Sequence, residues 1–171
     1  STVLRHKPIE LIEEELDDLH ARLGGRIGSL MIHDDITFHP QRVAEWCEVI
    51  LRKHGPIPLW MQVRSDWVVS CYQKHRDLWA LICRAGLTWA SVGYESGSQR
   101  MLDYLNKKTT VMENIEAGRI LDEAGVNSFG NFLWGLPTET NAEMDETVNL
   151  VAQIRPGYLS GSIYCNFPGT D

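Results

Sequence analysis

Five short apolar segments of the chain are each followed directly by charged or polar residues, or by the sequence Gly-Leu-Pro. In chain order these residues are Asp34, Asp35, Arg64, Glu95, Ser96, Gly135, Leu136, Pro137 and Asn166. Carboxylates pair with an ammonium group, and an arginine can hold a carboxylate through two parallel hydrogen bonds. A ligand that carries both an ammonium and a carboxylate therefore matches the set, provided that the fold brings the five positions together.

The segment GNFLWGLPTET, residues 130–140, shows how one of these positions is built. Its apolar run stops at Gly135, which has no side chain and lets a ligand approach the backbone. Pro137 lacks an N–H, so the chain cannot continue there as a central strand. Leu136 and Pro137 offer a flat apolar shelf for a purine ring, and Glu95 can accept hydrogen bonds from a ribose diol. We interpret the end of this apolar run as part of a ligand shelf.

The elements that must position these residues alternate along the chain. Apolar stretches typical of strands cover 27–35, 57–64, 87–96, 126–135 and 158–167. Helical spacing of apolar residues covers 8–25, 40–55, 73–86, 98–107, 111–125 and 142–154. Thr110 with Glu113, and Thr140 with Glu143, predict capping boxes at two helix starts.

This alternation predicts an α/β fold with a parallel sheet and right-handed crossovers. The carboxyl ends of parallel strands share one face of such a fold, and ligands bind there. We therefore expect the polar residues above to meet at that edge of the sheet.

Composition narrows the class of protein. A chain of 171 residues with 43% hydrophobic residues suits one domain with a sizeable core. The net charge of −7 disfavours nucleic acid and anionic membranes as partners, because both attract a basic face. No apolar run reaches the roughly 18 residues of a membrane span, and we expect no signal peptide. The four cysteines form no C-x-x-C pair, so we expect a reduced, cytoplasmic protein without a disulfide scaffold.

A second source of chemistry is the group His33, Asp34, Asp35 and His39, which could hold a catalytic metal ion. His33 and Asp34 would point to opposite sides of a strand, however, and His39 fits as the N-cap of a helix that begins at Pro40. G-x-G-x-x-G and P-loop patterns are absent, which disfavours dinucleotides and nucleoside triphosphates.

Five segments, taken in order, carry a family resemblance. They are HDDITFHPQRVAEWCEVILRKH, LWMQVRSD, AGLTWASVGYESGSQRMLDYLNKKTT, AGVNSFGNFLWGLPTETNAEMDETVNL and FPGTD. Together they resemble the radical S-adenosylmethionine (radical SAM) superfamily, and within it the branch whose members often carry an upstream cobalamin-binding domain. The combination of GYESGSQRML with GLPTET and PGT is the most specific part of the match.

The resemblance implies part of a TIM-like (β/α) barrel, with about five of its strands. It implies that the complete enzyme uses a four-iron four-sulfur cluster and an external electron donor to cleave S-adenosylmethionine to a 5′-deoxyadenosyl radical. That radical would abstract hydrogen from a small organic substrate, for methyl transfer, cyclisation or another C–H functionalisation. The branch implies cobalamin as a further cofactor of the complete protein.

The resemblance also assigns the strand ends to parts of S-adenosylmethionine. Asp34 and Asp35 resemble the motif that contacts the methionine amino group, and Glu95 and Ser96 the motif near the ribose and carboxylate. Gly135, Leu136, Pro137 and Glu139 resemble the motif beside adenine. Arg64 resembles the arginine of the third strand, and Asn166 completes the expected ligand set.

The sequence departs from the family pattern at the cluster. The family holds its cluster with three cysteines spaced C-x-x-x-C-x-x-C, and the cysteines here do not have that spacing. We therefore expect residues 1–171 to be a single partial core domain, truncated at both ends and inactive alone, with the cluster cysteines upstream and no metal ligand of its own. Exposed sheet edges would then favour self-association.

Two other hypotheses stay open beside the radical enzyme. One is a module that binds S-adenosylmethionine or a nucleoside without a cluster. The other is a fragment of a metal-dependent βα-barrel hydrolase that uses the group around His33. Within the resembled family, a tRNA-modifying member is less favoured because the chain is acidic.

Overall fold

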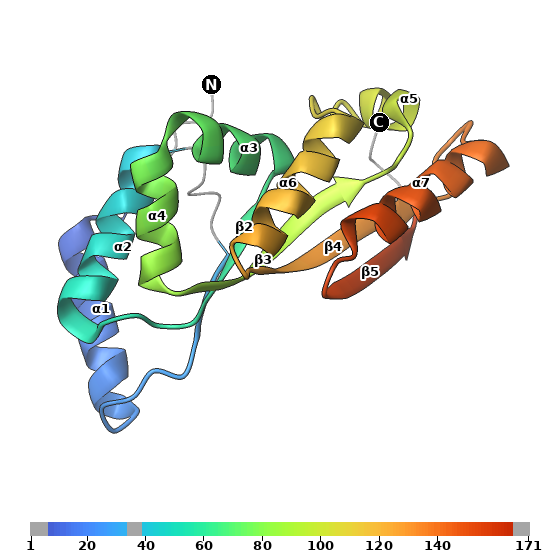
Figure 1. The fold of residues 1–171 in the computed structure, drawn as a ribbon. Coiled ribbons are helices and arrows are strands. Elements are labelled where there is room, and N and C mark those ends of the chain that lie inside the picture. The colour runs from blue at the N-terminus through green and yellow to red at the C-terminus, as the bar shows by residue number, and fades with distance from the viewer. Residues whose placement is uncertain (1–6, 34–38, 166–171) are drawn as a thin grey trace.

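The computed structural model describes residues 7–33 and 39–165, which form one parallel sheet with helices packed on one side (Figure 1). The strands are β1 (Leu30–Ile32), β2 (Leu59–Val63), β3 (Leu87–Glu95), β4 (Asn127–Trp134) and β5 (Tyr158–Ile163). They are hydrogen-bonded in the order β1-β2-β3-β4-β5, and every pair is parallel. The predicted α/β class with five parallel strands is confirmed.

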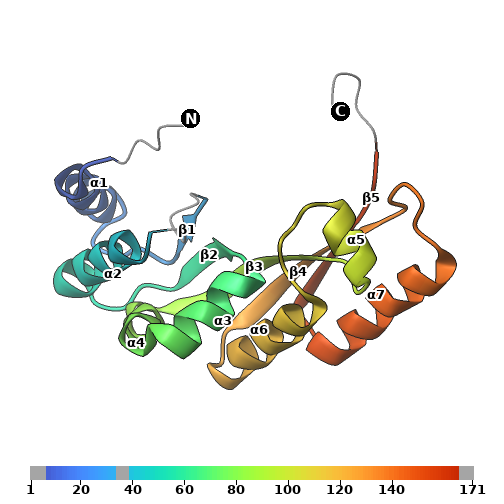
Figure 2. The ribbon, with the colours of Figure 1, turned by 90° about the horizontal axis from the view of Figure 1, so that it is seen from above.

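Seven helices are described. They are α1 (Ile9–Arg22), α2 (Pro40–His54), α3 (Ser65–Lys74), α4 (Arg76–Ala85), α5 (Gln99–Tyr104), α6 (Val111–Glu123) and α7 (Asn141–Ile154). Figure 2 shows α2, α3, α4, α6 and α7 along one face of the sheet, with α5 near the carboxyl ends of β3 and β4. Successive βα units therefore cross over on the same side, as they do in a barrel.

Local sequence signals set several of the helix boundaries. Thr110 and Thr140 form complete capping boxes at the starts of α6 and α7, as predicted. Helix α2 begins at Pro40 with His39 as its N-cap. Helix α4 is capped at its carboxyl end by Gly86, whose φ of +115° is left-handed and whose missing side chain lets the chain pass against the backbone of Ile57.

Helix α3 was not predicted. The helix expected over 73–86 is present as α4, and α3 precedes it; the two helices meet at His75, where φ −131° and ψ 54° interrupt the helical path. Residues 65–72 include β-branched valines and serines, which are weak helix formers. Burial of Val68 and Cys71 stabilises the helix instead, and Asp66 accepts a hydrogen bond from the backbone N–H of Trp67.

The main core lies between the sheet and its helices. Val92 and Tyr94 of β3 pack there with Ile50, Ile82 and Ile120 of the helical layer, and each is no more than 1% exposed.

The opposite face of the sheet carries a row of aromatic rings on neighbouring strands. The ring centroids of Trp60 and Trp89 are 5.5 Å apart, and those of Phe129 and Tyr158 are 4.6 Å apart. No described helix covers this face (Figure 2).

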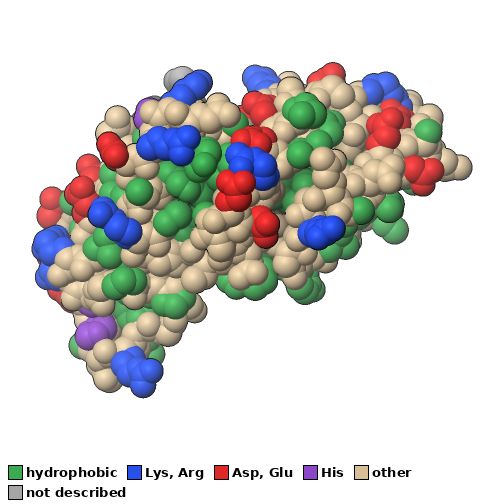
Figure 3. Space-filling view, in the orientation of Figure 1, with side chains coloured by type: hydrophobic (Ala, Val, Ile, Leu, Met, Phe, Trp, Pro, Cys, Tyr) green, Lys and Arg blue, Asp and Glu red, His purple; other side chains and the backbone are tan. Residues whose placement is uncertain are grey.

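The surface of the helical side mixes charges of both signs. Figure 3 shows basic and acidic side chains interspersed over the helices, without an extended basic area on the face in view. Within residues 7–33 and 39–165, no helix is both long and apolar enough to cross a membrane.

Candidate functional site

The predicted site residues that the structure describes lie at the carboxyl edge of the sheet. Glu95 is the last residue of β3 and Ser96 follows it, Arg64 follows β2, and Gly135 follows β4. Strands β3 and β4 are neighbours, with Glu95 in register with Phe132. Asp34, Asp35 and Asn166 lie outside the described residues, so their predicted roles stay predictions.

Glu95 is held in an unusual backbone conformation. Its φ of +62° is left-handed, which is uncommon for a residue with a side chain. Its Oε1 accepts a 2.6 Å hydrogen bond from Lys107 Nζ, and both side chains are mostly buried, at 18% and 23% exposure. A Cβ atom at Gly93 would lie 2.5 Å from that oxygen and 2.8 Å from that nitrogen. Gly93 thus leaves the space that the ion pair occupies.

Lys107 was not predicted as a site residue. It follows α5 in the loop that leads to α6. The Lys107 ammonium has three N–H donors, and one of them donates to a described residue, Glu95. No described residue donates a hydrogen bond to Glu95 Oε2. The pair therefore offers both a donor and an acceptor for a ligand at this edge.

Arg64 supports this loop. Its Nε and Nη2 each donate to the Asp66 carboxylate at 3.0 Å, and Nη2 also donates to the Lys107 carbonyl at 2.7 Å and Thr109 Oγ1 at 3.2 Å. This geometry assigns Arg64 to positioning the Lys107 segment. Its predicted contact with a ligand carboxylate stays a prediction.

The Ser96 hydroxyl faces the protein interior. The residue is fully buried, its Oγ lies 3.2 Å from Thr147 Oγ1 of α7, and it accepts a hydrogen bond from the N–H of Ser98. Thr147 also accepts from the N–H of Gly97. The Ser96 side chain therefore supports the loop after β3.

The predicted shelf after β4 is only partly as expected. Gly135 is exposed with a φ of +73°, and Pro137 is half-buried. Leu136 is 3% exposed, so its side chain packs inward and is not part of an open apolar surface. Glu139 Oε2 accepts hydrogen bonds from the N–H groups of Gly135, at 2.6 Å, and Leu136, at 3.1 Å. Gly135 and Pro137 are therefore the residues of the predicted shelf that reach the surface, and Glu139 fixes the backbone at Gly135 and Leu136.

A buried hydrogen-bond network links the end of β3 to two helices. Asn114 of α6 is fully buried; its Oδ1 accepts from Ser65 Oγ at 2.6 Å, and its Nδ2 donates to the Tyr94 carbonyl at 2.9 Å. The Tyr94 carbonyl immediately precedes Glu95. The network therefore fixes the backbone from which the Glu95 side chain departs.

The described cysteines do not fit an iron–sulfur cluster. Cys47 of α2 and Cys71 of α3 are buried, and loss of hydration raises the pKa of each thiol to about 12. Burial also raises the pKa of the Cys83 thiol. Iron is bound by thiolates, which these environments disfavour, and Cys165 is exposed in another part of the chain.

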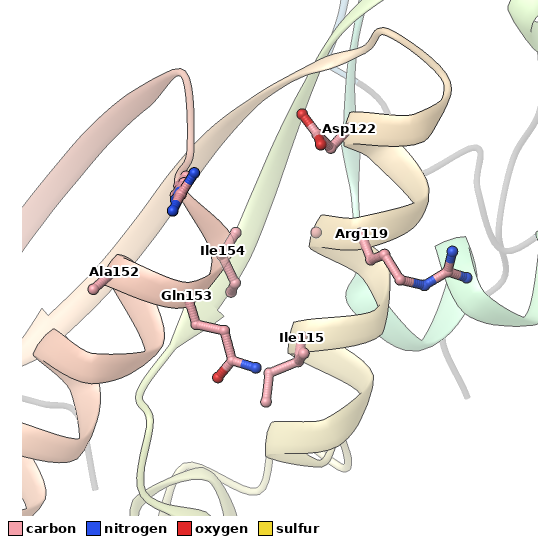
Figure 4. Close-up of a pocket in the computed structure, with 8 residues that line it drawn as sticks. Ile115, Arg119, Asp122, Ala152, Gln153 and Ile154 are labelled. Atoms are coloured by element: carbon pink, nitrogen blue, oxygen red, sulfur yellow. The ribbon is translucent and has the colours of Figure 1, made fainter.

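A groove of about 550 Å³ lies away from this edge, between α6 and α7 in the outer layer (Figure 4). Ile115 and Gln153 approach each other across it, while the Arg119 side chain points away. Arg119 instead pairs with Glu116 and Glu123 of its own helix. In the described part of the chain, no group of three or more histidine, cysteine or acidic residues could hold a metal ion.

A parallel sheet, one helical layer and polar groups at the carboxyl edge define part of a βα-barrel enzyme fold. A family model described as the Radical SAM superfamily matches residues 2–151, and the chain belongs to this family. The predicted resemblance is confirmed. Enzymes of this family use S-adenosylmethionine and a four-iron four-sulfur cluster.

Two relatives within this family have sequences similar to this chain. The chain is 29% identical over 141 residues to the anaerobic magnesium-protoporphyrin IX monomethyl ester cyclase of Cereibacter sphaeroides, with 82% of this chain and 23% of the relative covered. It is 31% identical over 173 residues to an uncharacterized methyltransferase of Pyrococcus horikoshii, with 97% and 35% covered. The chain thus spans between about a quarter and a third of the length of these relatives.

A solved structure shares the fold. The cobalamin-dependent S-adenosylmethionine radical enzyme OxsB, with aqua-cobalamin and S-adenosylmethionine bound, superposes with a TM-score of 0.72 at 24% identity. The match covers 86% of this chain and 22% of that chain.

Proposed function

We propose that this chain is the S-adenosylmethionine-binding part of a radical SAM enzyme, and that residues 1–171 form one partial core domain. The observation that carries the proposal is the Glu95–Lys107 pair beside the Gly135 shelf, on neighbouring strand ends at the carboxyl edge. Family membership supports this ligand over a metal-dependent hydrolase substrate.

The residues of this edge match the parts of the ligand. Glu95 accepts hydrogen bonds from the ribose hydroxyls through Oε2, while Lys107 neutralises Oε1 and donates to the ligand carboxylate. Gly135 and Pro137 receive the adenine ring, because a glycine backbone permits close approach. Asp34 and Asp35 pair with the methionine amino group, and Asn166 completes the set.

S-adenosylmethionine bound beside a reduced cluster supplies a 5′-deoxyadenosyl radical in this family. The role proposed for the described residues is limited to binding and orienting the ligand, because their cysteines do not fit the cluster. Cluster ligands upstream, an external electron donor, a small organic substrate and a cytoplasmic location remain parts of the proposal.

We propose cobalamin-associated methyl transfer or cyclisation as the reaction class of the complete protein. The named relatives support this class, since one is a cyclase, one a methyltransferase, and OxsB binds cobalamin. Detection of 5′-deoxyadenosine after anaerobic cluster reconstitution of the complete natural protein would distinguish this enzyme from a module that binds the ligand without a cluster.

Equilibrium binding of S-adenosylmethionine to the complete natural protein tests the site. Glu95→Gln and Lys107→Met each remove a charged hydrogen bond, and we expect about 10- to 100-fold weaker binding. Glu123→Gln is the matched control, because it removes a carboxylate from the opposite end of α6. Unchanged affinity in both site variants would show that the ligand binds elsewhere.

A further inference from the structure

Arg100, near the start of α5, joins two loops of the carboxyl edge. Its Nε and Nη2 each donate to the Glu143 carboxylate of α7 at 2.7 Å. Its Nη1 donates to Thr138 Oγ1 at 3.1 Å, and Nη2 also donates to the Thr138 carbonyl at 2.7 Å. One guanidinium therefore holds both the first turn of α7 and the loop after β4.

Glu143 carries the contact to the loop after β3. Its carboxylate accepts from Ser98 Oγ at 3.1 Å and from the Thr140 N–H and hydroxyl, each at 2.8 Å. Its side chain is 12% exposed. Arg100 and Glu143 thus connect three chain segments: the residues after Ser96, the segment at Thr138, and the start of α7.

Helix α6 provides an internal comparison. It begins with the same capping box, in which Glu113 accepts from the N–H and hydroxyl of Thr110. None of the described arginines donates to Glu113 in the structure. A capping box at a helix start does not need the arginine, so the bonds of Arg100 serve something besides the start of α7.

The segment that Arg100 holds is the one that forms the shelf. Thr138 has a left-handed φ of +68°, and the next residue, Glu139, fixes the N–H groups of Gly135 and Leu136. The Ser98 contact of Glu143 fixes the loop that follows Glu95. Removal of Arg100 would leave each loop folded but free to shift relative to the other.

We propose that Arg100 is a positioning residue that sets the spacing between Glu95 and the Gly135–Pro137 shelf, and so lets one nucleoside contact both. This inference rests on the proposed function, since the spacing matters only for a ligand that spans the two strand ends. Arg100 itself touches no proposed ligand atom and acts through Glu143 and Thr138.

The test compares two ligands in the complete natural protein. S-adenosylmethionine spans the whole edge, whereas 5′-deoxyadenosine carries the ribose and adenine alone. Loss of a bidentate charged contact that orients two binding groups should weaken both ligands about tenfold in Arg100→Met. Arg100→Lys keeps the charge without the forked geometry and should lie between the wild type and Arg100→Met.

Arg119→Met is the matched control, because Arg119 is a similarly exposed arginine that pairs with two carboxylates within its own helix. Hydrogen exchange provides a readout independent of the ligand. The N–H groups of Gly135, Leu136 and Thr140 should exchange faster in Arg100→Met than in the wild type, and at the wild-type rate in Arg119→Met. If Arg100→Met does not fold, Arg100→Lys supplies both measurements.

Equal affinities of the wild type and both Arg100 variants for both ligands would overturn the inference while leaving the proposed function intact. Loss of S-adenosylmethionine binding with unchanged 5′-deoxyadenosine binding would also overturn it, because the spacing concerns the nucleoside. If the wild type binds neither ligand, the proposed function fails, and the inference fails with it.

Discussion

Replacement of Asn114 by alanine should destabilise the protein far more than an ordinary helix substitution. Asn114 is fully buried and makes hydrogen bonds of 2.6 Å with Ser65 Oγ and 2.9 Å with the Tyr94 carbonyl. Each bond contributes about 1 kcal/mol net, and the Ser65 hydroxyl left unsatisfied in the interior costs about 1–3 kcal/mol, whereas the Tyr94 carbonyl keeps its bond from the Ser96 N–H. We therefore expect a loss of about 2–4 kcal/mol in the free energy of unfolding.

The assay is urea unfolding followed by tryptophan fluorescence, with Asn149→Ala as the matched control. Asn149 is exposed in the middle of α7, so its replacement should change stability by no more than about 0.5 kcal/mol, in the stabilising direction expected from helix propensity. Similar unfolding midpoints for the two variants would refute the assignment of Asn114 as a structural hydrogen-bond centre.

The same substitution links stability to the site. Without the bond from Asn114 Nδ2, the Tyr94 carbonyl keeps only the 2.8 Å hydrogen bond from the Ser96 N–H, and Glu95 lies between these two residues. Asn114→Ala should therefore also weaken S-adenosylmethionine binding under conditions where the variant is still folded, whereas Asn149→Ala should not.

Three further predictions concern other parts of the molecule. Gly97→Ala should lower stability by about 1–3 kcal/mol, because the added Cβ would overlap the carbonyl of Glu146 in α7, whereas Gly28→Ala meets no atom and should be nearly neutral in thermal unfolding. The Arg100 guanidinium and then the Thr140 N–H and hydroxyl hold the pKa of Glu143 well below its usual value. This lowered pKa stabilises the folded state at pH values above the unfolded-state pKa, which is near 4.5. The stabilisation is lost as pH falls below that value towards the folded-state pKa. The free energy of unfolding should therefore fall more steeply with decreasing pH in the wild type than in Glu143→Gln. Cys165 should react with a maleimide in the native protein, while Cys47 and Cys71 should react only after unfolding, as mass spectrometry of labelled peptides would show.

The sequence was most informative where the signal is local. The capping boxes at Thr110 and Thr140 and the stop at Gly86 follow from residues within a few positions of one another, and the structure has them as predicted. The parallel pairing of the strands also followed from the alternation of elements, whereas the TIM-like barrel was implied by the family resemblance.

Features that depend on distant contacts were missed. Helix α3 has little propensity of its own and forms because Val68 and Cys71 are buried against other elements. Arg100 and Glu143 are 43 residues apart, and nothing in their local sequence indicates that they meet. Leu136 reads as an exposed apolar residue beside a glycine and a proline, yet the turn directs it inward. The buried hydrogen-bond network around Asn114 could have been predicted, because Asn114 is a polar residue within the apolar stripe of its helix.

Backbone strain distinguishes the carboxyl edge of the sheet from the rest of the fold. Five non-glycine residues in the described parts have positive φ, and four of them lie at the carboxyl edge: Glu95 at the end of β3, and Asn106, Lys108 and Thr138 in loops. Each such residue costs about 1–3 kcal/mol and persists only where surrounding contacts fix it. Those contacts are present: Lys107 binds Glu95, Arg64 binds the Lys107 carbonyl, and Arg100 binds Thr138. Strained residues that surrounding contacts hold at one edge of the sheet therefore support the proposal that this edge binds a ligand.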